Sequence, residues 1–99
     1  EWDKSSLYFT GSTVVANGTV SAIVCNGGSD MTFSTTWELY FATRGNAKRG
    51  SVIDSGNFGP LANGECTTLS ASDQGLNGNF KFKAYQHPLH PGQGVLWSD

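Results

Sequence analysis

The feature that most limits what this chain can fold into is an alternation of apolar and polar residues with a period of two, confined to short runs. This period places successive side chains on opposite faces of a β-strand, whereas a helix needs a spacing of three to four residues. In the clearest run, 35–43, three large apolar residues alternate with other residues: Trp37, Leu39 and Phe41 against Glu38, Tyr40 and Ala42. A helix would turn Leu39 away from Trp37, so the run predicts a strand with both side chains in the core.

Seven runs of this kind are separated by short segments rich in Gly and Asn. They predict β-strands at residues 7–10, 19–26, 35–43, 51–55, 66–70, 79–86 and 95–98. The intervening segments favour turns, because Gly and Asn adopt positive φ at little cost. We expect Gly11 to end the first strand, and we expect the strand at 51–55 to be short and to lie at a sheet edge.

Seven short strands in 99 residues predict an all-β fold. Their number and spacing favour an antiparallel β-sandwich, Ig-like or fibronectin-like, over a barrel. No internal repeat, linker or charge run divides the chain, so we expect residues 1–99 to form a single domain. The chain begins at Glu1 without an initiator Met or a leader, which suggests the folded core of a longer exported precursor.

The chain carries few charges. Charged residues make up 14% of it, against about a quarter in a typical soluble domain, and its net charge is -2. Because proteins bind nucleic acid by neutralising phosphates with Lys and Arg, nucleic acid is not an expected partner. No apolar run approaches the ~20 residues that a membrane-spanning helix needs, so no membrane span is expected either.

The two cysteines lie on either side of the central strand in the sequence. Cys25 ends the second predicted strand and Cys66 begins the fifth. Two cysteines in a small exported domain usually pair, so we expect a structural disulfide between them; two buried free thiols are the alternative. Trp37 lies between them in the chain, as in an immunoglobulin core, but an immunoglobulin bridge joins the second and sixth strands.

No group of residues indicates catalysis or a bound cofactor. His87 and His90 could contribute to a metal site, but no third ligand follows at a typical spacing, and neighbouring prolines indicate an exposed loop. The chain has no GxSxG or comparable nucleophile motif. Asp54, Glu65 and Asp73 lie beside turns, where acidic residues are commonly solvated. We therefore predict that the protein is not an enzyme and has no catalytic, metal-binding or cofactor-binding residue.

The aromatic residues divide between the core and a candidate contact surface. Trp37 and Phe82 lie on the apolar faces of their strands, so we expect them in the core together with Trp97. Tyr40 and Tyr85 fall on the more polar faces and are candidates for a contact surface. Since exposed aromatic rings can stack on sugar rings, a carbohydrate-binding or cell-wall-binding β-sandwich is one hypothesis for the function.

Six segments of the chain resemble, in the same order, those of a known bacterial family. They are Trp2-Asp3-Lys4-Ser5-Ser6-Leu7, Thr36-Trp37-Glu38-Leu39-Tyr40, Gly50-Ser51-Val52-Ile53-Asp54-Ser55-Gly56, Phe82-Lys83-Ala84-Tyr85-Gln86, His90-Pro91-Gly92 and Leu96-Trp97-Ser98. Together they make the chain similar to the TasA anchoring/assembly protein (TapA) family, accessory proteins of the biofilm matrix in Gram-positive spore-forming bacteria. The family motif residues are Trp2, Asp3, Trp37, Glu38, Leu39, Phe82, Tyr85 and Trp97.

The resemblance implies a secreted protein of the extracellular matrix or cell surface. Members of the family promote the assembly of TasA fibres and help to anchor them to the cell. Related proteins are described as anchoring components of amyloid fibres and as assembly chaperones that donate a strand. The resemblance therefore implies a TasA-type fibre-forming protein as the partner, with the cell wall as a second candidate.

The edge strands of a sandwich carry unpaired backbone groups, to which a partner strand can add. Two edges are candidates for this contact. One is the strand at 7–10, with Leu7 and Phe9, and the other is the short strand around Val52 and Ile53. The sequence does not distinguish between them.

Overall fold

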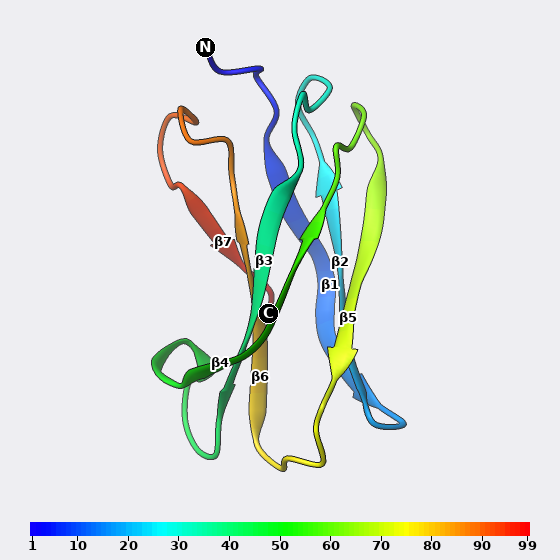
Figure 1. Cartoon of the computed structure of the whole chain (residues 1–99), viewed down its shortest axis with the longest axis vertical. Coiled ribbons are helices and arrows are strands. Elements are labelled where there is room, and N and C mark those ends of the chain that lie inside the picture. Colours follow the sequence, from blue (N-terminus) through cyan, green and yellow to red (C-terminus); the bar gives the residue numbers. More distant parts are fainter.

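The computed structural model describes residues 1–99 and consists of seven β-strands and one short 3-10 turn. The strands are β1 (Leu7–Ala16), β2 (Thr19–Asn26), β3 (Thr35–Ala42), β4 (Ser51–Phe58), β5 (Cys66–Ser72), β6 (Asn79–Tyr85) and β7 (Val95–Trp97), and the 3-10 turn η1 covers Ala47–Arg49. They form a three-stranded sheet in the order β1-β2-β5 and a four-stranded sheet in the order β4-β3-β6-β7 (Figure 1). All strand pairs are antiparallel, so the predicted β-sandwich is confirmed.

The fourth strand distinguishes this sandwich from an immunoglobulin constant domain. In that fold the fourth strand joins the sheet of the first, second and fifth strands. Here β4 pairs with β3 and becomes an edge of the other sheet. It lies at an edge, as expected, but it spans eight residues and is longer than the predicted 51–55.

The core lies between the two sheets and is built from alternate residues of the strands. Trp37, Leu39 and Phe82 belong to it, and the rings of Trp37 and Phe82 meet edge to face with their centroids 5.5 Å apart. Gly56 allows the Trp37 ring to lie directly over β4, because a Cβ at this position would come within 2.6 Å of the indole. The period-two pattern therefore identifies the inner face of β3 and β6.

The first strand does not end at Gly11, as the sequence suggested. It continues to Ala16 through an irregularity between Thr10 and Val14, where the register with β2 shifts. Gly11 adopts φ of 72°, which is typical of a residue in a β-bulge, so the glycine bends the strand without ending it. At its end, Asn17 and Gly18 both have positive φ and form the two-residue hairpin turn to β2.

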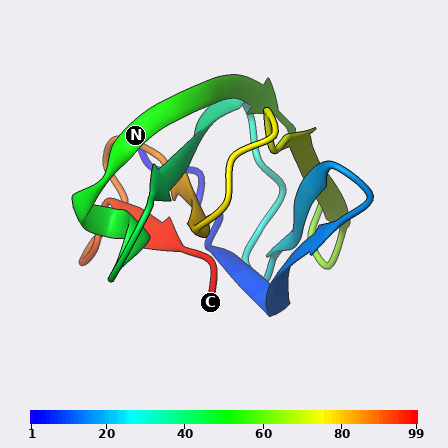
Figure 2. The ribbon, with the colours of Figure 1, turned by 90° about the horizontal axis from the view of Figure 1, so that it is seen from below.

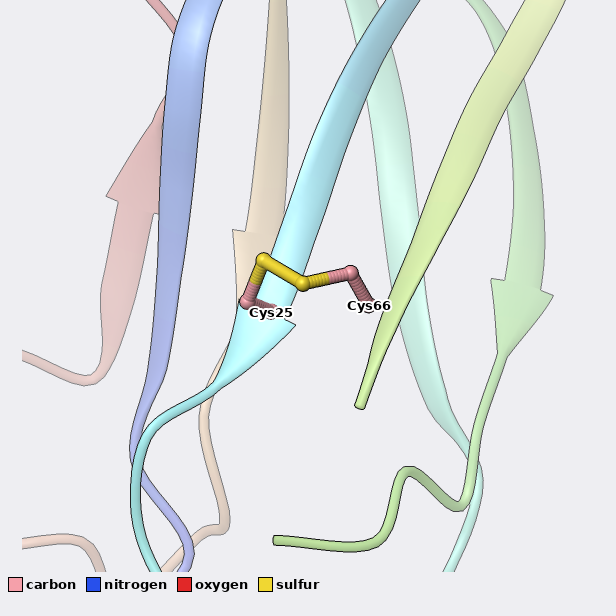
Figure 3. The surroundings of a disulfide bond; sticks show 2 residues. All are labelled: Cys25 and Cys66. Atoms are coloured by element: carbon pink, nitrogen blue, oxygen red, sulfur yellow. A yellow bond between two sulfur atoms is a disulfide. The ribbon is translucent and has the colours of Figure 1, made fainter. Parts of the chain in front are cut away.

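Cys25 and Cys66 form the expected disulfide, and it joins neighbouring strands of one sheet. The two residues are directly opposite in the pairing of β2 with β5, with Cα atoms 4.0 Å apart (Figure 3). An immunoglobulin bridge instead crosses between the sheets. The disulfide of this chain therefore attaches the edge strand β5 to the central strand β2.

Candidate functional site

The three-stranded sheet carries no charged residue. None of the residues of β1, β2 and β5 is Asp, Glu, Lys or Arg, although the chain contains fourteen such residues, eight acidic and six basic. Four of the chain's six exposed large apolar side chains lie on these strands: Tyr8 (49% exposed), Val14 (51%), Val15 (50%) and Ile23 (43%). Natural sheets usually carry charges near exposed edges, so this uncharged sheet is an unusual surface.

The outer face of the four-stranded sheet carries a cluster of aromatic rings around one lysine. The Nζ atom of Lys83 lies 5.8 Å from the ring centroid of Tyr40, 5.0 Å from that of Tyr85 and 5.4 Å from that of Trp97. The Tyr85 hydroxyl donates a hydrogen bond of 2.7 Å to the Glu38 carboxylate. Cation–π contacts of this kind stabilise cross-strand pairing.

Within this aromatic cluster, neighbouring groups alter the pKa values of Tyr85 and Lys83. The hydrogen bond to Glu38 and burial both raise the pKa of Tyr85 above its usual value. Desolvation acts to lower the pKa of Lys83, but its hydrogen bond with Tyr85 and its electrostatic interactions with Tyr85, Tyr40 and Glu38 outweigh burial and raise it. The lysine therefore stays charged and the tyrosine neutral at physiological pH.

Trp97 lies in this cluster and not in the core. Leu96 is opposite Ala84 and faces inward, so the next residue, Trp97, is opposite Lys83 and faces outward. Its ring meets that of Tyr40 edge to face at 66°. Since rings that stack on sugars must present one flat surface, this crossed arrangement differs from a typical sugar-binding platform.

The N-terminal motif Trp2-Asp3 fastens the start of the chain to the loop before β3. One carboxylate oxygen of Asp3 accepts from the backbone N–H of Ser5 at 2.9 Å, and the other accepts from both the backbone and the hydroxyl of Thr32 at 3.0 Å. The indole of Trp2 donates to the carbonyl of Ser5 and its ring contacts His90 edge to face. The motif residues of this segment therefore hold a local structure together.

The two histidines have separate packing roles. The Nδ1 atom of His87 accepts from the backbone of Leu89, and its ring meets Phe33 edge to face. His90 contacts Trp2 and lies 3.5 Å from the hydroxyl of Ser6. No group of three or more His, Cys, Asp or Glu side chains gathers anywhere in the structure.

The edge of β1 is closed by groups from distant parts of the chain. The Gln86 side chain accepts from the N–H of Leu7 at 2.9 Å and donates to its carbonyl at 3.0 Å, as a neighbouring strand would. Further along, the N–H of Thr13 donates to the carbonyl of Asp99. The bulge at Gly11 lies between these two points. The side chain of Leu7 is buried, so Leu7 contributes to the core and not to an exposed surface.

The edge of β4 is also interrupted. Its register with β3 shifts between Val52 and Asp54, which leaves Ile53 in a bulge. The Gln74 side chain donates to the Ile53 carbonyl at 2.9 Å, and the N–H of Ser55 donates to the Asp54 carboxylate at 2.8 Å. On the opposite side of the four-stranded sheet, the edge strand β7 has only three residues. Nothing in the sequence marked Gln86 or Gln74 as groups that close an edge, because each acts on a residue far away in the chain.

A groove of about 350 Å³ lies beside the second half of β1. It is lined mainly by small and polar residues, including Thr13 and Val15 of β1, Asn46 and Asp99. Figure 2 shows the C-terminus next to β1 at this side of the sandwich. The groove contains no cluster of titratable groups that would indicate catalysis.

The structure contains no helix that could cross a membrane, since its one helical element has three residues. A search of the curated proteins found no match. Comparison with protein-family models matches residues 4–99 to the TasA anchoring/assembly domain. Because this match covers nearly the whole chain, the protein belongs to the TasA anchoring/assembly domain family.

Proposed function

We propose that the chain is a non-enzymatic protein of the extracellular matrix that promotes the assembly of TasA-type fibres and their anchoring at the cell surface by pairing a β-strand with the fibre subunit. Membership of the family supports a role in TasA fibre anchoring or assembly and an interaction with TasA fibres. The pairing mechanism is the step that this proposal adds.

The observation that carries the mechanism is the absence of charge from all three strands of one sheet. Charged side chains near an edge prevent the addition of foreign strands. A sheet without them is suited to β-augmentation, in which backbone hydrogen bonds supply affinity and alternate side chains supply selectivity. The disulfide supports an extracellular location, because such bonds persist in oxidising surroundings.

Fibre growth of purified TasA-type subunit tests this function. We expect a sub-stoichiometric amount of the chain to shorten the lag of fibre growth. An edge strand that is already folded gives the first subunit a strand to pair with, so the slow association of two free subunits is no longer needed. A matched amount of the heat-denatured, reduced chain is the control. An unchanged lag, together with retention of the chain on peptidoglycan or a polysaccharide, would instead support the alternative of a carbohydrate-binding or cell-wall-binding module.

A further inference from the structure

We propose that β5 is the edge that accepts the partner strand, and that this strand is an uncharged extended segment of the TasA-type fibre subunit. The inference rests on the proposed pairing with the subunit and adds its position in the fold. It differs from both edges that the sequence suggested, β1 and β4.

The backbone of β5 presents unpaired groups along one side. A hydrogen bond from Asn26 N to Glu65 O flanks the Cys25–Cys66 pair, so this pair itself does not exchange backbone bonds. Backbone groups alternate in direction along a strand, so Thr68 and Ser70, like Cys66, point theirs away from β2. Each of these residues offers one N–H and one C=O to an incoming strand.

None of the features that interrupt the other edges occurs on β5. Its register with β2 runs without a shift from Cys66 to Ser72, and it contains no proline and no charge. Its one hydrogen bond from outside the sheet comes from Gln74 N to the Ser72 hydroxyl, which leaves the backbone free. β4 lies nearby but does not pair with it. A regular, uncharged edge of this kind is what strand addition requires.

The surroundings of β5 define the chemistry of the partner strand. Toward the core, Leu69 is buried and Ala71 packs against the core cluster, so the partner residues beside them would be apolar. On the outer face, Thr68 and Ser70 are exposed and small, which suits small polar neighbours. The disulfide attaches Cys66 to β2 and so holds the first residue of β5 in register before the partner binds.

The test compares the affinity of variants for purified TasA-type subunit, measured by biolayer interferometry. We expect Thr68→Pro, which removes an outward N–H, and Ser70→Lys, which adds a charge, each to weaken binding by about tenfold or more. The matched control is Ser55→Lys, an identical change on the exposed edge of β4, which should alter affinity by less than about twofold. Circular dichroism and thermal unfolding establish that each variant is folded. If Thr68→Pro does not fold, Ser70→Lys alone tests the edge.

Amide hydrogen exchange gives an independent readout on the unmodified chain. Addition of the subunit should slow exchange at Thr68 and Ser70. Equal weakening by Ser70→Lys and Ser55→Lys, or new protection along β1 or β4 instead, would overturn the assignment. Protection of β5 that rises with the concentration of the chain alone, and not with the subunit, would also overturn it, because the occupant would then be a second copy.

Normal binding by Ser70→Lys defeats only the choice of edge, whereas failure of the unmodified chain to bind the subunit or shorten the lag defeats the proposed function.

Discussion

Asp3 is the residue whose charge the fold stabilises most clearly. Desolvation acts to raise the pKa of its carboxyl group, but hydrogen bonds from Ser5 and Thr32 outweigh burial and hold the pKa well below its usual range. A carboxylate with a lowered folded-state pKa stabilises the fold above its unfolded pKa of about 3.9, and this contribution is lost as the pH falls through the folded-state value.

We expect Asp3→Ala to lower the free energy of unfolding at pH 7 by about 1–2 kcal/mol, because the donors of Ser5 and Thr32 lose a charged acceptor. The difference from the unmodified chain should shrink at about pH 3, where the unfolded chain is largely protonated. Urea unfolding at the two pH values measures both effects, with Glu1→Ala as a control at an exposed carboxylate that accepts no hydrogen bond. A loss of equal size at both pH values would contradict the role of charge.

Glu38 and Tyr85 supply a second prediction at the scale of single residues. We expect Glu38→Ala to lower the pKa of Tyr85, because it removes the acceptor of the Tyr85 hydroxyl. Ultraviolet difference spectra of tyrosinate measure the change, and Tyr85→Phe identifies its contribution among the three tyrosines. An unchanged titration would mean that the hydrogen bond does not persist in solution.

The Tyr85 hydroxyl also makes the stability of the fold depend on pH in the alkaline range. Its folded-state pKa is raised, so the neutral Tyr85 contributes stability that is fully present below the unfolded pKa of about 10 and is lost as the pH rises through the folded-state value. The raised pKa of Lys83 acts in the same direction. The aromatic cluster on the four-stranded sheet therefore stabilises the neutral tyrosine beside a charged lysine.

At the scale of elements, β5 depends on the disulfide more than any other strand does. It pairs with one neighbour only, and its first residue is the bridged Cys66. The bridge closes a sequence separation of 41 residues, for which the chain-entropy model gives about 4 kcal/mol of stabilisation. The disulfide therefore secures the proposed docking edge as well as the fold.

We expect the double variant Cys25→Ala/Cys66→Ala to lose about 4 kcal/mol of unfolding free energy, because its unfolded chain is less restricted. Amides at the start of β5 should exchange faster relative to those between β1 and β2 than in the bridged chain. Urea unfolding and hydrogen exchange measure these effects, and added reductant should not change the variant further. Exchange that accelerates equally in the β1–β2 pair and the β2–β5 pair would argue against a local role of the disulfide at β5.

At the scale of the whole molecule, Gln86 joins the two sheets at one side of the sandwich. It follows β6 of the four-stranded sheet, and its buried amide bonds to both backbone groups of Leu7 in β1. The buried backbone of Leu7 has no strand neighbour on that side, so the side chain replaces one. The bond also closes the edge of β1 against a foreign strand.

We expect Gln86→Leu, which keeps the size of the side chain, to destabilise the protein by about 2 kcal/mol or more, because it leaves the N–H and C=O of Leu7 buried without partners. Thermal and urea unfolding measure the loss. Gln93→Leu makes the same chemical change at an exposed loop position and should have little effect. Similar losses of unfolding free energy in both variants would show that the hydrogen bonds between Gln86 and Leu7 contribute nothing specific.

Much of the fold could be predicted because strand formation is a local property. The alternation of apolar residues identified all seven strands and the inward positions of Trp37 and Leu39. Gly11 was misleading, since the same positive φ that ends a strand can also form a bulge within it. Trp97 was misplaced because three residues of β7 are too few for a period of two to define the inner face.

The sequence by itself determined the strands, the hairpin turn and the absence of charge from 7–26 and 66–72. Only the tertiary structure decided which edges are closed. Gln86 reaches Leu7 across 79 residues of sequence, and Asp99 reaches Thr13 across 86. Backbone alternation depends on neighbouring residues, whereas an edge is closed by groups that meet only after the two sheets have packed together.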